Sequence, residues 1–177
     1  IDAHSHISMG MAVIGLANLN SPPVGDVKNI SDIVNKLKSH QEKNSIPKGT
    51  WIGGWGYDPD LLEENRHPNK LDLDEVFPDH PVLLIHVSGH MAVINSTALE
   101  KVGMDKNSPD PPGGKIVRLP NSNEPNGLLQ ETAFFVARNA LPTPTTEQSM
   151  MLFEATQELY ASHGITTAQD GFTDYKN

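Results

Sequence analysis

Two histidines separated by one residue, His4 and His6, stand near the start of the chain in the sequence IDAHSHI. In an extended strand, residues two apart point to the same side, so both imidazoles and the carboxylate of Asp2 would share one face. The two Cα atoms would lie roughly 6.6 Å apart, which lets the rings converge on one ion about 2.0–2.1 Å from each nitrogen. The spacing predicts a metal site, against the alternative of two unrelated histidines on an exposed strand.

Further histidines and aromatic residues could belong to a site. His86 and His90 are four residues apart in HVSGH, but Val87 occupies the position where a zincin motif has glutamate. A structural role or a place at the mouth of a substrate pocket is therefore favoured over metal binding. The aromatic residues of TWIGGWGY, Trp55 among them, could line a pocket or pack in the core. The remaining histidines, His40, His67, His80 and His163, are interpreted as surface or capping residues.

Three polar residues are further candidates. Glu131 lies near the start of a predicted helix, where the dipole favours a carboxylate. Gln169 and Asp170 end a β-branched strand, and active-site residues of α/β barrels lie at such strand ends. The alternative for Asp170 is ordinary turn chemistry, because Asp-Gly is a common turn sequence.

The elements that must position these side chains alternate between strand and helix. VLLIHV, residues 82–87, is typical of a buried strand, and IDAHSHI, TWIGGWGY and KIVRL indicate others. Helices are predicted near residues 31–46, 71–76, 97–102, 128–140 and 145–163, and residues 8–25 are predicted as loop. A capping box at Thr97 and Glu100 would begin one helix. The last helix, Gly164 and a strand at 165–168 form one αβ unit of a parallel sheet, so the fold class is α/β.

Composition narrows the classes of function. The 177 residues carry a formal net charge of −9 and include no cysteine. The acidic balance argues against nucleic acid or an anionic membrane as partner, because both require basic patches. The lack of cysteine excludes disulfides, thiolate zinc sites and cysteine nucleophiles. No apolar run approaches the roughly 18 residues of a membrane-spanning helix. The compartment stays open, with the cytoplasm favoured, and a strand signal at residue 1 without Met indicates a piece of a larger protein.

Several motifs in order resemble one known family. IDAHSHI resembles the first barrel strand of the amidohydrolase superfamily, whose members carry an H-x-H pair there. WIGGWGYDPDLL, LDLDEVFPDHPVLLIHVSGHMAVINSTALEKVG, PPGGKIVR, NGLLQETA and HGITTAQDG are similar to the amidohydrolase-3 family. That family includes YtcJ-like hydrolases, N-substituted formamide deformylases and proteins labelled exoenzyme regulatory protein AepA. The resemblance runs through almost the whole chain.

The resemblance implies how the chain is organised. Residues 1–30 would hold the first strand of a metal-dependent-hydrolase TIM barrel and a loop, residues 31–142 a large α+β insert, and residues 143–177 a helix and the second strand. A complete barrel needs at least roughly 200 residues, more than the chain has. The remaining strands, the β-sandwich domain, a metal-binding lysine, two histidines and a catalytic aspartate would lie elsewhere in the protein. The strands at 1–7 and 165–170 should be parallel neighbours.

The resemblance also implies an activity. The whole protein would hydrolyse C–N bonds in a small amide-like or formamide-like substrate, with His4 and His6 binding a divalent metal, most simply Zn²⁺. Glu131, in GLLQET, matches a position of the family's motif near the active site, and Glu131 and Asp170 are the candidate acids of this chain. The candidate pocket residues are Trp55, His90 and Gln169.

Residues 1–177 alone are expected to be inactive and to bind zinc weakly, because two histidines are fewer than the three protein ligands usual for catalytic zinc. The alternative is a non-catalytic folded module with a partner-binding or AepA-like regulatory role. The open edges of the two barrel strands could also drive self-association.

Overall fold

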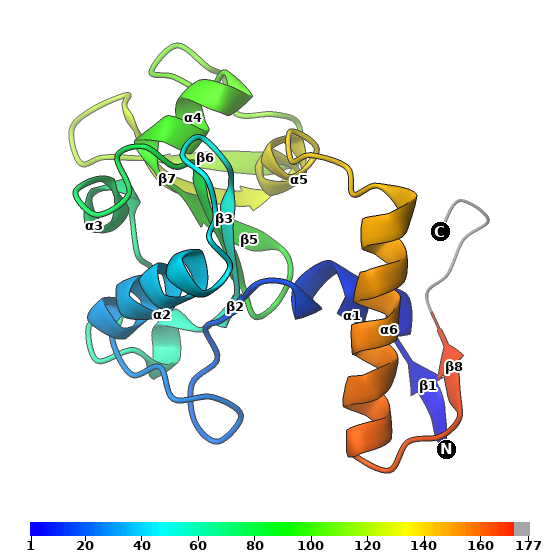
Figure 1. Cartoon of the computed structure of the whole chain (residues 1–177). Helices are drawn as coiled ribbons and strands as arrows, with labels where there is room; N and C mark the ends of the chain where they lie inside the picture. The colour runs from blue at the N-terminus through cyan, green and yellow to red at the C-terminus, as the bar shows by residue number, and fades with distance from the viewer. Residues whose placement is uncertain (172–177) are drawn as a thin grey trace. The chain divides into compact units, whose positions relative to one another are not determined.

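The computed structural model describes residues 1–171, which form two compact units. The larger unit is the continuous segment Leu16–Leu141. The smaller unit combines Ile1–Gly15 with the segment that begins at Pro142. Figure 1 shows both units with the elements labelled.

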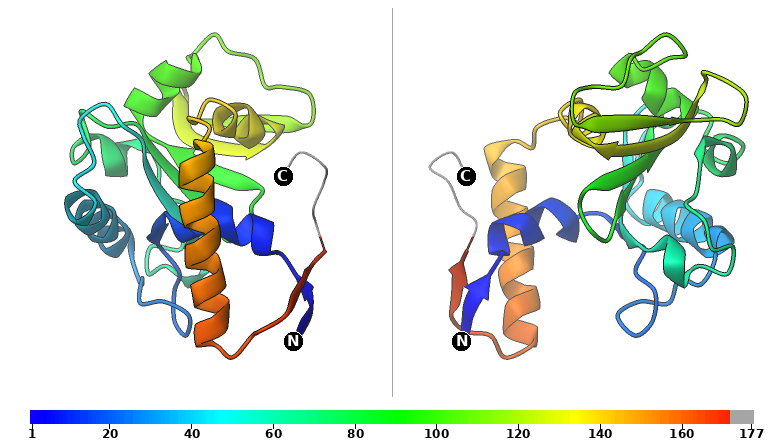
Figure 2. Two further views of the ribbon diagram at one scale, coloured as in Figure 1. Left: turned by 45° about the vertical axis from the view of Figure 1, so that its right-hand side comes forward. Right: turned by 180° about the vertical axis from the view of Figure 1, so that it is seen from behind.

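A six-stranded mixed sheet forms the centre of the larger unit (Figures 1 and 2). Its strands are β2 (Ala17–Asn18), β3 (Ile52–Tyr57), β4 (Val82–His86), β5 (Met91–Ile94), β6 (Gly114–Arg118) and β7 (Pro125–Glu131), in the order β2-β3-β4-β5-β7-β6. The first three strands of that order are parallel to one another, and the β4–β5, β5–β7 and β6–β7 pairs are antiparallel. Strands β3, β4 and β7 therefore all end at the same edge of the sheet.

Helices cover both faces of this sheet. They are α2 (Ile30–Lys43), α3 (Lys70–Asp74), α4 (Ser96–Val102) and α5 (Thr132–Arg138), with a short 3₁₀ turn η1 at Pro59–Leu61. Successive residues of a strand point to opposite faces. Leu84 of β4 accordingly packs in the core shared with α2 and α3, and its neighbour Leu83 packs in the core shared with α4 and α5. All five residues of β4 are buried, as predicted for a central strand.

Asn95 begins α4 and ties it to the sheet. Its completely buried side chain accepts hydrogen bonds from the backbone N–H groups of Val82 and Ala98, and it donates to the carbonyls of Phe77 and His80. The prediction of a capping box at Thr97 and Glu100 is wrong, because the helix begins two residues earlier than the motif implied.

The segment around residues 125–138 also differs from the prediction. A helix was expected over residues 128–140, but residues 125–131 form β7 and only Thr132–Arg138 is helical. Leu128 and Leu129 pair with Val93 and Ala92 of β5, a strand that the sequence patterns did not reveal. Pairing between segments about 35 residues apart decided the conformation, and no local pattern reports such pairing.

The smaller unit contains β1 (Asp2–Ser5), α1 (Ile7–Ile14), α6 (Thr146–Ser162) and β8 (Ala168–Asp170). The predicted parallel pairing of its two strands is confirmed, with Asp2 opposite Ala168 and Ser5 opposite Asp170. Residues 7–14 form a helix, whereas a loop was predicted for residues 8–25. Close approach to α6 holds this helix, since a Cβ atom added at Gly10 would lie 3.1 Å from the Thr156 side chain.

Candidate functional site

His4 and His6 lie close together at the carboxyl ends of β1 and β8. Their ring centroids are 5.2 Å apart and the ring planes are nearly perpendicular. The predicted proximity of the two rings is therefore found. The predicted cause, that both residues lie on one face of a single strand, is wrong. His6 lies outside the strand as the N-cap of α1, and an irregularity in the β1–β8 register between Asp2 and Ser5 interrupts simple alternation.

The surroundings of the histidine pair combine an open side with a tightly packed one. Both imidazole side chains are exposed, while Ser5 between them is buried and its hydroxyl bonds to the hydroxyl of Tyr160 in α6. Gly171 lies directly against His4, because a Cβ atom added there would be 2.9 Å from the imidazole carbon Cε1. A side chain at position 171 would therefore move the His4 ring.

Asp170 stands beside the histidine pair and has a structural contact. Its Oδ2 atom accepts a 2.8 Å hydrogen bond from the backbone N–H of Ser8 in the first turn of α1. A carboxylate in that place satisfies one of the free N–H groups of the helix and interacts favourably with its dipole. Gln169, the preceding residue of β8, is exposed.

Two imidazoles are a suitable but incomplete ligand set for a divalent metal. Imidazole nitrogen suits zinc and several other transition metals. Within residues 1–171, however, no group of three or more histidine, aspartate or glutamate residues is placed to hold one ion. His4 and His6 could therefore supply part of a metal site, with further ligands required from elsewhere.

A second group of polar residues lies at the edge of the larger unit where β3, β4 and β7 end. His90 follows the turn after β4, and its Nδ1 atom is 3.0 Å from Oε2 of Glu131 at the end of β7. The backbone joins the same two residues, since the Glu131 N–H donates to the His90 carbonyl at 2.8 Å. The two side chains are 60% and 55% exposed, so the pair is accessible from solvent.

Glu131 has an unusual backbone conformation. Its φ of 52° and ψ of −123° place a non-glycine residue in a strained region at the sharp turn from β7 into α5. Strain of this kind costs on the order of 1–3 kcal/mol and is found preferentially at functional sites. The sequence could not reveal this conformation, because it arises from the junction of a strand and a helix.

A cluster of three rings lies at the same edge. His86 ends β4, and its ring centroid is 5.4 Å from that of Tyr57 and 5.8 Å from that of His67. The Tyr57 hydroxyl is 3.1 Å from Nδ1 of His67. Burial lowers the pKa of both histidines, and the carboxylates of Asp58 and Asp60 oppose that shift. Burial also raises the pKa of the Tyr57 hydroxyl far above its usual value.

The structure places the other candidate and unassigned residues as follows. Trp55 is half-buried against the core beside α4 and α5, near Gly89. His67 was interpreted as a surface or capping residue but belongs to the ring cluster. His80 was given the same interpretation, yet it is 4% exposed and bonds to the Thr50 carbonyl and to Gln41. His163 is the C-cap of α6, as a capping role predicts.

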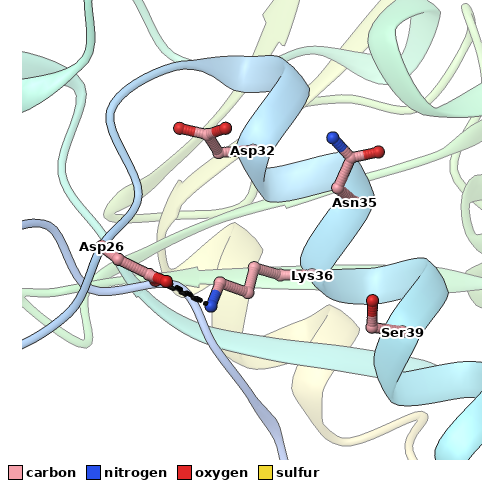
Figure 3. A pocket seen from close by; sticks show the side chains of 5 residues that line it. All are labelled: Asp26, Asp32, Asn35, Lys36 and Ser39. Carbon is pink, nitrogen blue, oxygen red and sulfur yellow. Dashed lines mark hydrogen bonds and ion pairs between the residues drawn. The ribbon is translucent and has the colours of Figure 1, made fainter.

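A small surface cavity of about 210 Å³ lies beside α2 (Figure 3). Its lining residues are Asp26, Asp32, Asn35, Lys36 and Ser39. The Lys36 amine and the Asp26 carboxylate face each other there and form an ion pair of 2.7 Å. Asp32 is committed to the start of α2, where it accepts from the Lys28 N–H. These contacts account for the charged groups locally, and none of the candidate site residues lines the cavity.

No helix within residues 1–171 is both long and apolar enough to cross a membrane.

Comparison with known proteins decides the family. The model of the amidohydrolase family matches residues 1–177, the whole chain. The chain belongs to the amidohydrolase family.

Two curated relatives support the assignment. An N-substituted formamide deformylase from Arthrobacter pascens is 29% identical over all of this chain and 32% of its own length. The amidohydrolase YtcJ of Bacillus subtilis, a name given as putative, is 39% identical over 58% of this chain and 19% of its own length. The chain thus spans a third or less of the length of these relatives.

Among solved structures, an uncharacterized metal-dependent hydrolase from Pyrococcus furiosus has the same fold. The match covers 95% of this chain and 30% of that protein, with 23% sequence identity and a TM-score of 0.60. At this level of identity the likeness concerns the mixed α/β fold.

Proposed function

We propose that the chain is the insert-bearing part of a metal-dependent amidohydrolase barrel that hydrolyses C–N bonds in small amides. In this proposal β1 and β8 are the first two barrel strands, and the larger unit is the insert between them. The supporting observation is the pair of imidazole rings, 5.2 Å apart, at the carboxyl ends of two parallel strands. Active sites of (β/α)₈ barrels lie at that end of the strands.

His4 and His6 would bind the metal through ring nitrogens, with Zn²⁺ the first candidate. A divalent metal, when bound, would activate a water molecule and polarise the substrate carbonyl. Formamides are the first substrate class to test, because one relative is named for their deformylation. Gln169, the exposed residue of β8 in the same unit as the two histidines, is proposed to contact the substrate.

The two candidate acids, Asp170 and Glu131, differ in their contacts with the rest of the protein. Asp170 already holds the first turn of α1 through Ser8, so its structural role accounts for its position. Glu131 is exposed, strained and paired with His90. We therefore propose that Glu131 is the functionally more important of the two carboxylates.

The test compares the complete protein with single variants on formamides, N-acyl amino acids and cyclic ureides, with metal content measured in parallel. We expect metal-dependent turnover by the wild type, and His6→Ala should abolish it together with most of the bound metal. Residues 1–177 alone should show no measurable turnover and weak zinc binding by calorimetry. Turnover by this chain near the rate of the complete protein would refute the partial-barrel proposal.

Gly171→Ala tests the position of His4 without removing any ligand. The new methyl group would push the His4 ring, while the backbone of residue 171 has no positive φ that alanine would strain. We expect about 10–100-fold weaker metal binding in the complete protein, the range seen when residues that orient metal ligands are changed. Unchanged affinity would mean that the His4 ring does not bind the metal in this orientation.

An alternative role is association rather than catalysis. Within the described residues, β1 and β8 form a sheet of only two strands, so each has one open edge. Such a sheet is marginal on its own, and open edges can pair with another chain. Met150 and Met151 of α6 are also exposed. If the complete protein shows no hydrolysis but forms a defined complex through these edges, the partner-binding or regulatory role is correct.

A further inference from the structure

Helix α1 begins at a residue whose side chain does not cap it. The first N–H groups of a helix have no partner within that helix, and the side chain of the N-cap residue usually accepts from one of them. The helices α2, α3, α4 and α6 follow this rule, with the N-cap residues Asn29, Asn69, Asn95 and Thr145. His6 is the N-cap of α1, and its side chain makes no such hydrogen bond. The first turn of α1 therefore needs an acceptor from another element.

Asp170 supplies that acceptor from the end of β8. Its Oδ2 atom accepts from the backbone N–H of Ser8, the second residue of the helix, at 2.8 Å. The N–H of the second residue is one of the two that an N-cap oxygen usually binds. The pairing of β1 with β8 places Asp170 opposite Ser5, the residue before His6. The N–H of Gly171 donates to the Ser5 carbonyl at 2.8 Å and holds the end of β8 in this register.

The backbone of His6 is fixed by the residues on both sides of it. The His6 carbonyl accepts from the N–H of Gly10 at 2.9 Å, which joins His6 to the first turn of α1. On the other side, Ser5 is buried and its hydroxyl is bonded to the hydroxyl of Tyr160. A shift of the first turn of α1 would therefore move His6 relative to His4, whose ring centroid lies 5.2 Å away.

We propose that Asp170 is a positioning residue and not a catalytic acid: it caps α1 in place of the His6 side chain, so that the His6 imidazole can bind the metal. The inference rests on the proposed function and adds the residue that orients one of its ligands. Serine, threonine, asparagine or aspartate at position 6 would cap the helix from within, but none of them would place an imidazole there.

Helix α5 supports the same division of roles. Its N-cap residue, Glu131, also makes no cap hydrogen bond with its side chain, and the Glu131 carboxylate contacts His90 instead. The N-cap side chains that do not cap their own helices, His6 and Glu131, are thus both candidate site residues. Asp170 resolves for α1 the conflict between capping the helix and placing a functional group at its first turn.

A cycle of two substitutions tests the cap without any metal. Asp170→Ala removes the acceptor, so the Ser8 amide of the metal-free complete protein should exchange about 2–30-fold faster, the range that corresponds to the loss of a helix cap. In His6→Asn the new N-cap residue can accept from the first turn itself. Adding Asp170→Ala to that variant should therefore change the exchange rate little. Equal acceleration in both backgrounds would overturn the proposal, because position 6 and Asp170 would then not substitute for each other.

A conservative substitution separates positioning from catalysis. Asp170→Asn keeps an oxygen that can accept from Ser8, but it removes the carboxylate that acid–base catalysis requires. The complete protein with this change should keep its Zn²⁺ affinity, the visible absorption spectrum of bound Co²⁺ and its turnover of the amide that the wild type hydrolyses fastest. Asp170→Ala should bind Zn²⁺ about 10–100-fold more weakly and change the Co²⁺ spectrum, because the orientation of a ligand is lost.

The outcomes distinguish this inference from the proposed function. Lost turnover in Asp170→Asn with metal retained would identify Asp170 as a catalytic acid, which overturns the inference and leaves C–N hydrolysis intact. That variant decides between the two roles even if Asp170→Ala does not fold. Unchanged Zn²⁺ affinity in a folded Asp170→Ala would also overturn the inference. Equal Zn²⁺ affinity in the wild type and His6→Ala would overturn the proposed function, and the inference with it.

Discussion

The two units of the chain contain similar elements but differ in what they bury. Every fully buried apolar side chain of the described residues belongs to the larger unit, from Ala17 to Ala137. Among residues 1–15 and 142–171, the described part of the smaller unit, only the polar residues Ser5 and Thr156 are buried to that degree. The larger unit thus has the core of an independent domain, while the described residues of the smaller unit do not form one.

This difference indicates where each unit obtains its stability. Burial of apolar surface is the main favourable contribution to folding, at roughly 25 cal/mol per Å². A helix pair and a two-stranded sheet without a buried apolar residue cannot offset the entropy of ordering their backbone. The contrast supports the proposal that β1 and β8 belong to a larger barrel, whose further strands would supply the missing contacts.

Hydrogen exchange of residues 1–177 should show the largest effect of this difference. Amides of β4 should exchange only by global unfolding, and amides of α6 by local opening with little free-energy cost. Because such opening energies extend from near zero to the global value, we expect rates about 10³-fold or more apart. Equal protection in β4 and α6 would mean that the smaller unit is stable without further strands.

A pair of core and surface substitutions sharpens the comparison. Leu84 is completely buried between β4 and the helices, so Leu84→Ala should lower the free energy of unfolding by about 2–5 kcal/mol. Met151 of α6 is 64% exposed. Met151→Ala should therefore change the free energy of unfolding by less than about 0.5 kcal/mol. Urea denaturation followed by the fluorescence of Trp51 and Trp55 measures the larger unit, and hydrogen exchange of the α6 amides at increasing urea measures the smaller one. A large effect of Met151→Ala would reveal a core that the smaller unit does not show.

The same difference explains which elements the sequence could predict. Strand β4 and helix α2 were predicted because continuous apolar residues or helical spacing mark an element buried in the core. Helix α1 was missed because Gly10 weakens its local preference, while its support comes from Thr156 and Asp170, more than 140 residues away. Strand β7 was taken for a helix for a similar reason, since β5 determines its conformation.

The candidate site was predictable in its residue types but not in its connections. The H-x-H spacing indicated that His4 and His6 would be close. No pattern indicated that His90 would pair with Glu131, 41 residues later, or that His67 would contact His86. Both pairings depend on β3, β4 and β7 ending at one edge of the sheet, which only the topology determines.

The smallest effect that we predict concerns pH and belongs to the larger unit. Burial lowers the pKa of both His67 and His86, and the neighbouring His86 lowers the pKa of His67 further. The carboxylates of Asp58 and Asp60 partly oppose both shifts. An unfolded histidine binds its proton near pH 6.5. Below that pH the unfolded state holds more protons than the folded state, until the folded histidines also titrate. The free energy of unfolding should therefore be highest above about pH 6.5 and fall as the pH drops below it.

Urea denaturation between about pH 8 and pH 5 measures this dependence above the range in which ordinary carboxylates titrate. His67→Gln keeps an acceptor for the Tyr57 hydroxyl but cannot be protonated, so it should reduce the loss of stability in acid. Asp58→Asn keeps a side chain that can cap η1 but removes a charge that favours protonated histidine. It should lower both pKa values further and increase the loss. Because the two variants are expected to change the slope in opposite directions, a slope unaffected by either would mean that these imidazoles are not held neutral by burial.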